Sequence, residues 1–139
     1  MKRLIGFRQA AITAAALFGL LSLFHLSIII GIVIFDYAPV EFLWGGQMET
    51  RDELLRFEWV SLGVILICLN TVLIRYGWVQ LPGMLKTTRV ILWVLMALFF
   101  LNTLGNILAE TVFEKIFAPV TLVLALLCLR LAMEPFDRS

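Results

Sequence analysis

Long apolar runs alternate with short polar segments along the chain, and this pattern predicts its elements. Four runs contain almost no charged residue: 10–35, 57–74, 90–109 and 112–133. A helix of about 20 apolar residues crosses the ~30 Å hydrocarbon layer of a bilayer, and each run is long enough to do so. We therefore predict an all-α membrane protein with four transmembrane helices in an up-down-up-down antiparallel bundle.

Capping residues predict where two of these helices begin. Thr50 precedes Glu53 by three residues, and Thr111 precedes Glu114 by the same interval. Both pairs match the S/T-x-x-E capping box, in which the hydroxyl residue caps the helix and the acid lies in its first turn. The second box follows the third apolar run almost at once. The third and fourth runs should therefore form a tight antiparallel hairpin.

Length and composition place the whole chain in a membrane. Of its 139 residues, 62% are hydrophobic and 15% are charged, and the net charge is +1. Four spans leave less than half of the chain for loops, so we predict that residues 1–139 form a single four-helix transmembrane domain. The basic start resembles that of a signal peptide, but the first run continues far beyond a signal's apolar region, so we expect a retained span.

The distribution of lysine and arginine predicts the orientation. Eight of the 11 lie at the two ends and in the loop between the second and third runs, and three lie in the other two connections. The eight are Lys2, Arg3, Arg8, Arg75, Lys86, Arg89, Arg130 and Arg138, and the three are Arg51, Arg56 and Lys115. The positive-inside rule then places both termini in the cytoplasm. The lipid bilayer is the expected partner, nucleic acid is not, and a second copy or another membrane protein remains open.

Polar side chains within the predicted spans are the candidates for function, because they are costly in lipid and usually face a bundle interior. Asn102, Asn106 and Glu110 recur at intervals of four residues, which places them on one stripe of a helix. The predicted topology puts this stripe in the outer half of the membrane, together with Glu58 and His25. These five residues are our candidates for a ligand or ion path. The same asparagines equally suit hydrogen bonds that only hold helices together.

His25 is the only histidine of the chain. A rise of 1.5 Å per residue puts it about 15 Å from the outer end of its helix, whereas Glu58 lies close to the outer end of the next one. We therefore expect a neutral His25 that is bonded to a hydroxyl or to Asn102 rather than to Glu58. Arg56 and Lys115 are expected to supply countercharge at the rim of the polar patch.

Sequence motifs for enzymes and cofactors are absent. The chain contains no G-x-x-x-x-G-K-[ST], G-x-G-x-x-G or H-E-x-x-H motif, and one histidine disfavours a His-based metal site. No catalytic residue, cofactor or metal is therefore predicted. Ser22 and His25 lack a third group for a hydrolase triad. Cys68 and Cys128 are expected to be free thiols in the core.

Several short segments resemble those of small bacterial four-span membrane proteins. They are Trp44-Gly45-Gly46, Arg56-Phe57-Glu58, residues 102–109, Glu114-Lys115 and Arg130-Leu131-Ala132. The resemblance covers most of the chain and implies a bacterial inner membrane, without a particular chemistry. Our leading interpretation is a non-enzymatic channel or transporter subunit, or an accessory protein of a membrane assembly. The alternative is a membrane-embedded enzyme or a binding protein for a lipid-like ligand.

Overall fold

The protein is all-α and has four helices that are long and apolar enough to cross a membrane. The computed structural model describes residues 5–44, 47–109 and 111–135. Its helices are α1 (Phe7–Phe35), α2 (Arg51–Tyr76), α3 (Leu85–Leu108) and α4 (Val112–Ala132), with a short 3-10 turn η2 (Pro82–Met84) before α3. The described residues include no strand. The predicted fold class is confirmed, and the chain is a multi-pass membrane protein.

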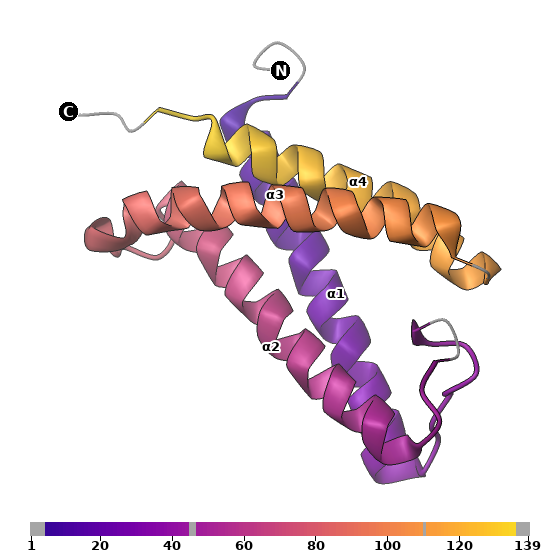
Figure 1. Ribbon diagram of the computed structural model, residues 1–139. Coiled ribbons are helices and arrows are strands. Elements are labelled where there is room, and N and C mark those ends of the chain that lie inside the picture. Colours follow the sequence, from indigo (N-terminus) through magenta and orange to yellow (C-terminus); the bar gives the residue numbers. More distant parts are fainter. Residues whose placement is uncertain (1–4, 45–46, 110, 136–139) are drawn as a thin grey trace.

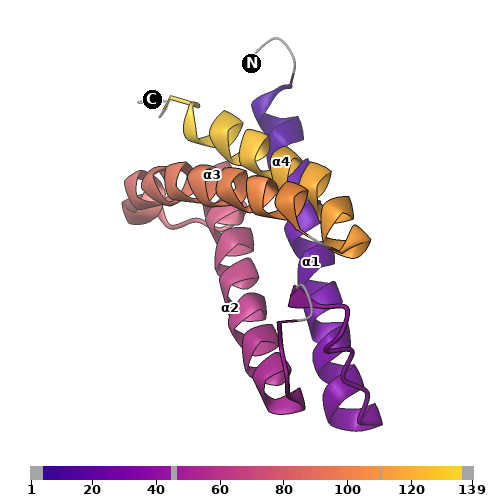
Figure 2. The same ribbon diagram turned by 45° about the vertical axis from the view of Figure 1, so that its right-hand side comes forward.

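The helices form two antiparallel hairpins that cross one another (Figure 1). Helix α1 lies along α2, and α3 lies along α4. Figures 1 and 2 both show the second hairpin running steeply across the end of the first hairpin where α1 begins and α2 finishes. Consecutive helices alternate in direction as predicted, whereas the steep crossing of the two hairpins was not expected from the sequence.

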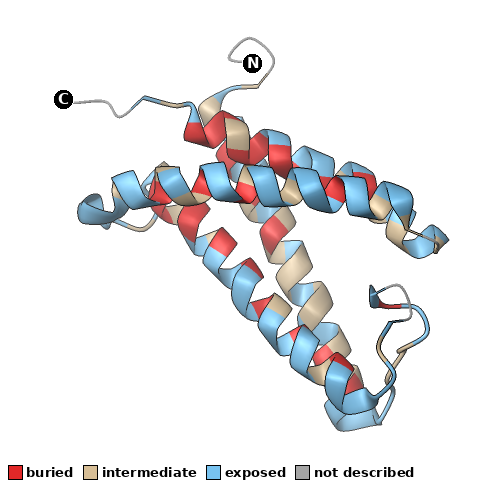
Figure 3. Cartoon of the chain, viewed as in Figure 1, coloured by how far each residue is buried: buried red, intermediate tan, exposed pale blue. Residues whose placement is uncertain are grey.

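The main core lies where the hairpins cross. On α1, Ala10, Ala11, Ala14 and Phe18 are fully buried in a cluster that also includes side chains of the other three helices. Alanine allows helix backbones to approach closely, which is how membrane helices commonly pack. Figure 3 shows buried positions concentrated on the facing sides of the helices, with exposed positions on the outer sides. The outer sides carry many large apolar residues, as expected of a surface that faces lipid.

Both predicted helix caps are present. The Thr50 hydroxyl accepts the backbone N–H of Glu53 at 3.2 Å, and the Thr111 hydroxyl accepts that of Glu114 at 3.2 Å. The Glu53 carboxylate accepts the N–H of Glu49 at 3.1 Å, one residue before the N-cap. The caps therefore fix the start of α2 and the start of α4 through local bonds, as the sequence predicted.

Two buried arginines bind the ends of several segments together near the crossing. Arg130 donates from Nε to the carbonyl oxygen of Ile5 at 3.0 Å and forms an ion pair of 2.7 Å with Glu134. Arg75 donates from Nε to the carbonyl of Leu131 at 3.2 Å and from its guanidinium to the carbonyl of Glu134. We call Arg75, Arg130 and Glu134 the arginine cluster. It joins the start of the described chain, the end of α2 and the end of α4.

Candidate functional site

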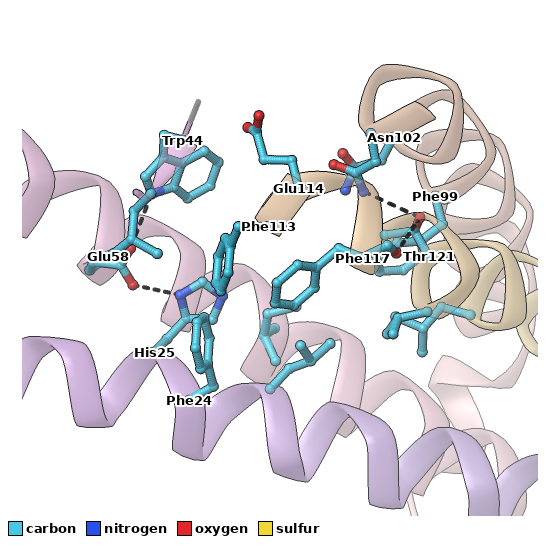
Figure 4. Close-up of a pocket in the computed structure, with 16 residues that line it drawn as sticks. Phe24, His25, Trp44, Glu58, Phe99, Asn102, Phe113, Glu114, Phe117 and Thr121 are labelled. Carbon is cyan, nitrogen blue, oxygen red and sulfur yellow. Dashed lines mark hydrogen bonds and ion pairs between the residues drawn. The ribbon is translucent and has the colours of Figure 1, made fainter. Parts of the chain in front are cut away.

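A cavity of about 230 Å³ is lined by residues of all four helices and of the loop after α1. Four of the five predicted site residues line it: His25 on α1, Glu58 on α2, and Asn102 and Asn106 on α3 (Figure 4). The fifth, Glu110, lies outside the described residues. We call this space the polar cavity. The structure thus brings four of the five predicted residues to one cavity.

His25 and Glu58 are in direct contact. His25 Nδ1 lies 2.6 Å from Glu58 Oε2, so the expectation that His25 would bond to a hydroxyl or to Asn102 was wrong. The reason is the reach of the side chains. Glu58 is about two turns into α2, roughly 10 Å along its axis, and His25 is about 15 Å from the end of α1. The remaining difference of about 5 Å is within the span of the two side chains together.

Glu58 is buried, and both of its carboxylate oxygens have partners. Its side chain is 1% exposed, and Oε1 accepts the indole N–H of Trp44 at 3.0 Å. Trp44 has a φ of 53°, in the left-handed region that a bulky side chain seldom adopts. Such backbone conformations persist where surrounding contacts fix them, often at functional sites. The loop after α1 therefore supplies a specific partner for the buried acid.

The contact between His25 and Glu58 holds one hydrogen-bonding proton. A neutral imidazole that donates from Nδ1 to a carboxylate gives this contact with a net charge of −1. With one more proton the pair is neutral, either as an imidazolium facing a carboxylate or as a carboxylic acid facing a neutral imidazole, and these neutral states suit an apolar interior because an unpaired buried charge is costly. Gain or loss of a single proton then changes the charge at the cavity by one unit.

The expected countercharges do not border the polar cavity. Arg56 and Lys115 are exposed, and neither belongs to the lining. Arg51 forms an ion pair of 3.1 Å with Asp36, beyond the end of α1. Among the described residues that line the cavity, His25 is therefore the only basic side chain.

The asparagines differ in their contacts. Asn106 Nδ2 lies 3.5 Å from the hydroxyl of Thr121, which is a weak contact, and Thr103 lies 2.9 Å from the same hydroxyl. Asn102 lines the cavity without a side-chain hydrogen bond to any described residue. The role of Thr121 was missed, although it is the only hydroxyl side chain of α4. A single hydroxyl residue within an apolar run could have indicated that Thr121 bonds to another helix.

A second cavity of about 440 Å³ lies between α2 and α3. It shares His25, Trp44 and Asn102 with the polar cavity, and the rest of its lining is mostly apolar. We call it the apolar cavity. His25 therefore borders two cavities of different character, whereas Glu58 lines the polar cavity alone.

Other polar groups near the site serve local structure. The Ser22 hydroxyl donates to the carbonyl of Phe18 at 2.9 Å, within its own helix. Cys68 and Cys128 are free and buried in the main core. The hydroxyl of Ser22 therefore does not bond to His25. The two cysteines are free thiols in the core, as expected.

Comparison with known proteins adds no further assignment. No protein-family model, no curated protein and no solved structure matches this chain.

Proposed function

We propose that the protein is a proton-linked transport subunit, in which the His25–Glu58 pair carries the proton and the polar cavity receives the ligand. The observation that carries the proposal is the 2.6 Å contact between His25 Nδ1 and Glu58 Oε2 at the wall of a cavity. Intramembrane ionisable residues are costly and commonly belong to proton relays or ligand paths.

The chemistry of the pair supports a linkage between proton and ligand. When the pair holds its proton it is neutral, and when it loses the proton it attracts a ligand of opposite charge. Ligand and proton then affect each other's binding reciprocally, as two linked equilibria must. If the site opens alternately to the two sides of the membrane both with and without the proton, the pair carries protons across on its own, and a bound ligand competes with that proton.

We further propose that the protein resides in a bacterial inner membrane with both termini in the cytoplasm. The support is the resemblance given above and the eight-to-three distribution of lysine and arginine. The test introduces a cysteine at Gln47 or at Gln80. An impermeant thiol reagent should label Gln47→Cys from outside and should not label Gln80→Cys. The native cysteines are buried and add little background. The reverse labelling pattern would contradict the orientation.

Proton transport itself is tested in liposomes loaded with a pH-sensitive dye. A potassium gradient with valinomycin makes the interior negative, and wild-type protein should acidify the interior faster than protein-free vesicles. Glu58→Gln and His25→Gln should return the rate to that of protein-free vesicles. A wild-type rate equal to that of protein-free vesicles would contradict the proposal.

Asn70→Leu is the matched control for this assay. Asn70 is an intramembrane polar residue whose amide donates to Leu66 of its own helix at 2.9 Å, and it lies outside both cavity linings. Its loss should leave the proton flux unchanged. A flux lost equally in Asn70→Leu and Glu58→Gln would point to a general effect on packing.

A lipid-like ligand is the second candidate, because the apolar cavity lies between α2 and α3 and its lining is mainly hydrophobic. Native mass spectrometry of the purified protein would detect such a ligand. A retained lipid that is displaced by Leu98→Trp, a substitution in the apolar cavity alone, would favour this reading over proton-linked transport.

A further inference from the structure

The lining of the polar cavity combines carboxylates with aromatic rings. From it we infer that the ligand is a small organic cation, exchanged for the proton of the His25–Glu58 pair. This inference rests on the proposed function and specifies the ligand of the same site.

Acidic groups dominate the charge of the cavity. Glu58 and Glu114 both line it, and His25 is the only basic side chain among its described lining residues. Glu114 is partly buried, and its Oε2 accepts the hydroxyl of Thr111 at 3.0 Å. In Figure 4 the Glu114 side chain appears between Trp44 and Asn102. A ligand in this space therefore meets carboxylates from two different helices.

Aromatic rings supply much of the remaining wall. The rings of Phe24 and Phe117 are 6.0 Å apart between centroids, and those of Phe117 and Phe113 are 5.2 Å apart. Trp44 and Phe99 line the same space. A cation within about 6 Å of an aromatic centroid is attracted by the negative face of the ring. Rings from α1, α3, α4 and the loop after α1 thus surround a space that also contains carboxylates.

Other ligand classes fit this lining less well. An anion would face two carboxylates without an arginine or lysine in the described lining. A hard metal cation takes six to eight oxygen ligands or a compact octahedral set, and the described residues contain no group of three or more His, Cys, Asp or Glu able to hold a metal. The volume of about 230 Å³ is smaller than the ~300–1,000 Å³ of pockets for drug-sized ligands, which favours a small molecule.

The exchange conserves charge within the membrane. Without ligand, the pair holds one proton and is neutral. When the cation enters, that proton leaves to water, and the pair then carries one negative charge against the positive charge of the ligand. The Trp44 indole contacts the pair, and the other polar or charged side chains of the lining are Asn102, Asn106, Glu114 and Thr121.

The sign of the pH dependence follows from this balance. Because a proton must leave for a cation to bind, lower pH weakens binding and higher pH strengthens it. With one proton released per cation, the apparent affinity changes about tenfold per pH unit in the range where the pair is protonated.

The test uses phenyltrimethylammonium, an aromatic cation that can neither gain nor lose a proton. Its binding to the purified full chain in lipid nanodiscs is measured by calorimetry at several pH values between about 5 and 8, the range in which histidine ordinarily titrates. We expect the affinity to rise with pH by about tenfold per unit in the acidic part of the range, with one proton released per cation. Benzenesulfonate, which has a similar ring and the opposite charge, should not bind.

Substitutions of Glu58 and of Phe117 separate the contribution of the carboxylate from that of the aromatic rings. Glu58→Gln should weaken binding at least tenfold, and His25→Gln added to it should abolish the pH dependence, because neither residue of the pair can then exchange a proton. Phe117→Leu keeps the pair and removes one ring, so it should weaken binding several-fold while the pH dependence remains. Asn70→Leu should behave as wild type in both respects. Circular dichroism and gel filtration establish that each variant is folded, and Phe117→Leu keeps the test decisive if Glu58→Gln does not fold.

Three results would overturn the inference: equal binding of benzenesulfonate, cation binding without proton release, or no cation binding at all. If cation binding is absent but the liposomes still show proton flux that requires Glu58, the inference fails and the proposed function stands. If both are absent, both fail. Binding with proton release but no flux would keep the cation site and overturn transport.

Discussion

The arginine cluster and the His25–Glu58 pair both bury charged groups in an apolar surrounding, yet they differ in what they can do. Arg75 and Arg130 are 6% and 4% exposed, and Glu58 is 1% exposed. The arginines bond to backbone carbonyls and to Glu134, and arginine does not lose its proton in proteins. Glu58 instead faces His25, whose imidazole can gain or lose a proton, at the wall of a cavity. Burial of charge alone therefore does not identify a site; a titratable partner and adjacent space do.

The sequence Leu-Asn-Thr provides a second comparison, because it occurs at 69–71 and at 101–103. Asn70 and Thr71 bond only to backbone carbonyls of their own helix. Thr103 lies 2.9 Å from Thr121 on α4, and Asn102 lines both cavities. The three-residue match carries no functional meaning, but it gives substitutions of Asn102 and Thr103 matched controls at Asn70 and Thr71.

The largest effect on stability should come from the arginine cluster. Arg130→Leu removes the bond to the Ile5 carbonyl and the pair with Glu134, whose carboxylate is 30% exposed, so we expect a loss of about 2 kcal/mol, less than for a fully buried pair. Arg130→Lys keeps the charge beside Glu134 and should cost about half as much. Denaturant unfolding in mixed micelles measures both. Equal stability of Arg130→Leu and wild type would show that the cluster does not hold the chain ends.

Removal of the acid at the cavity should act on function more than on folding. In Glu58→Gln the amide oxygen still accepts the Trp44 N–H and the amide nitrogen still donates to His25, so we expect a stability change of only about 1 kcal/mol. The proton flux should nevertheless be lost. If Glu58→Gln destabilises the protein as much as Arg130→Leu, the two regions do not differ in kind and the pair is structural.

A smaller effect is expected at the contact between α3 and α4. Thr103→Val removes a hydroxyl that bonds across helices, and such bonds are worth about 0.6 kcal/mol on average in membranes. Thr71→Val removes one that bonds only within its helix and should cost less. Unfolding of the two variants under the same conditions checks the difference. A larger loss for Thr71→Val would contradict the assigned role of the Thr103–Thr121 contact.

The smallest effect on stability should come from the asparagines. Asn102→Leu and Asn70→Leu should both change the free energy of unfolding by less than about 0.5 kcal/mol, since neither removes a hydrogen bond between helices. Only Asn102→Leu should reduce the proton flux, because only Asn102 faces the cavities. Equal flux in the two variants would remove Asn102 from the site.

Much of the fold was predictable because it depends on local sequence. Apolar run length identified the four helices, and the Thr50 and Thr111 caps were found from a four-residue pattern. The polar stripe on α3 was likewise a matter of helical periodicity. Each of these features depends on the residues of a single segment.

The missed features depend on how separate helices are rotated and offset. The contact between His25 and Glu58 depends on the reach of two side chains from different helices, which a depth estimate from helical rise does not resolve. The crossing of the hairpins depends on packing between them. Trp44 donates to Glu58 from a left-handed backbone conformation. The sequence Trp44-Gly45-Gly46 does not indicate that Trp44 itself adopts this conformation.

The most direct test of the account is the hydrogen bond between His25 and Glu58. Because the chain has one histidine, ¹⁵N-histidine labelling gives a single imidazole in solid-state NMR spectra of the protein in bilayers. We predict an Nδ1 signal characteristic of a strong hydrogen bond to a carboxyl group, which changes with pH and is lost in Glu58→Gln. An imidazole signal that is the same in wild type and Glu58→Gln at every pH would contradict the central claim.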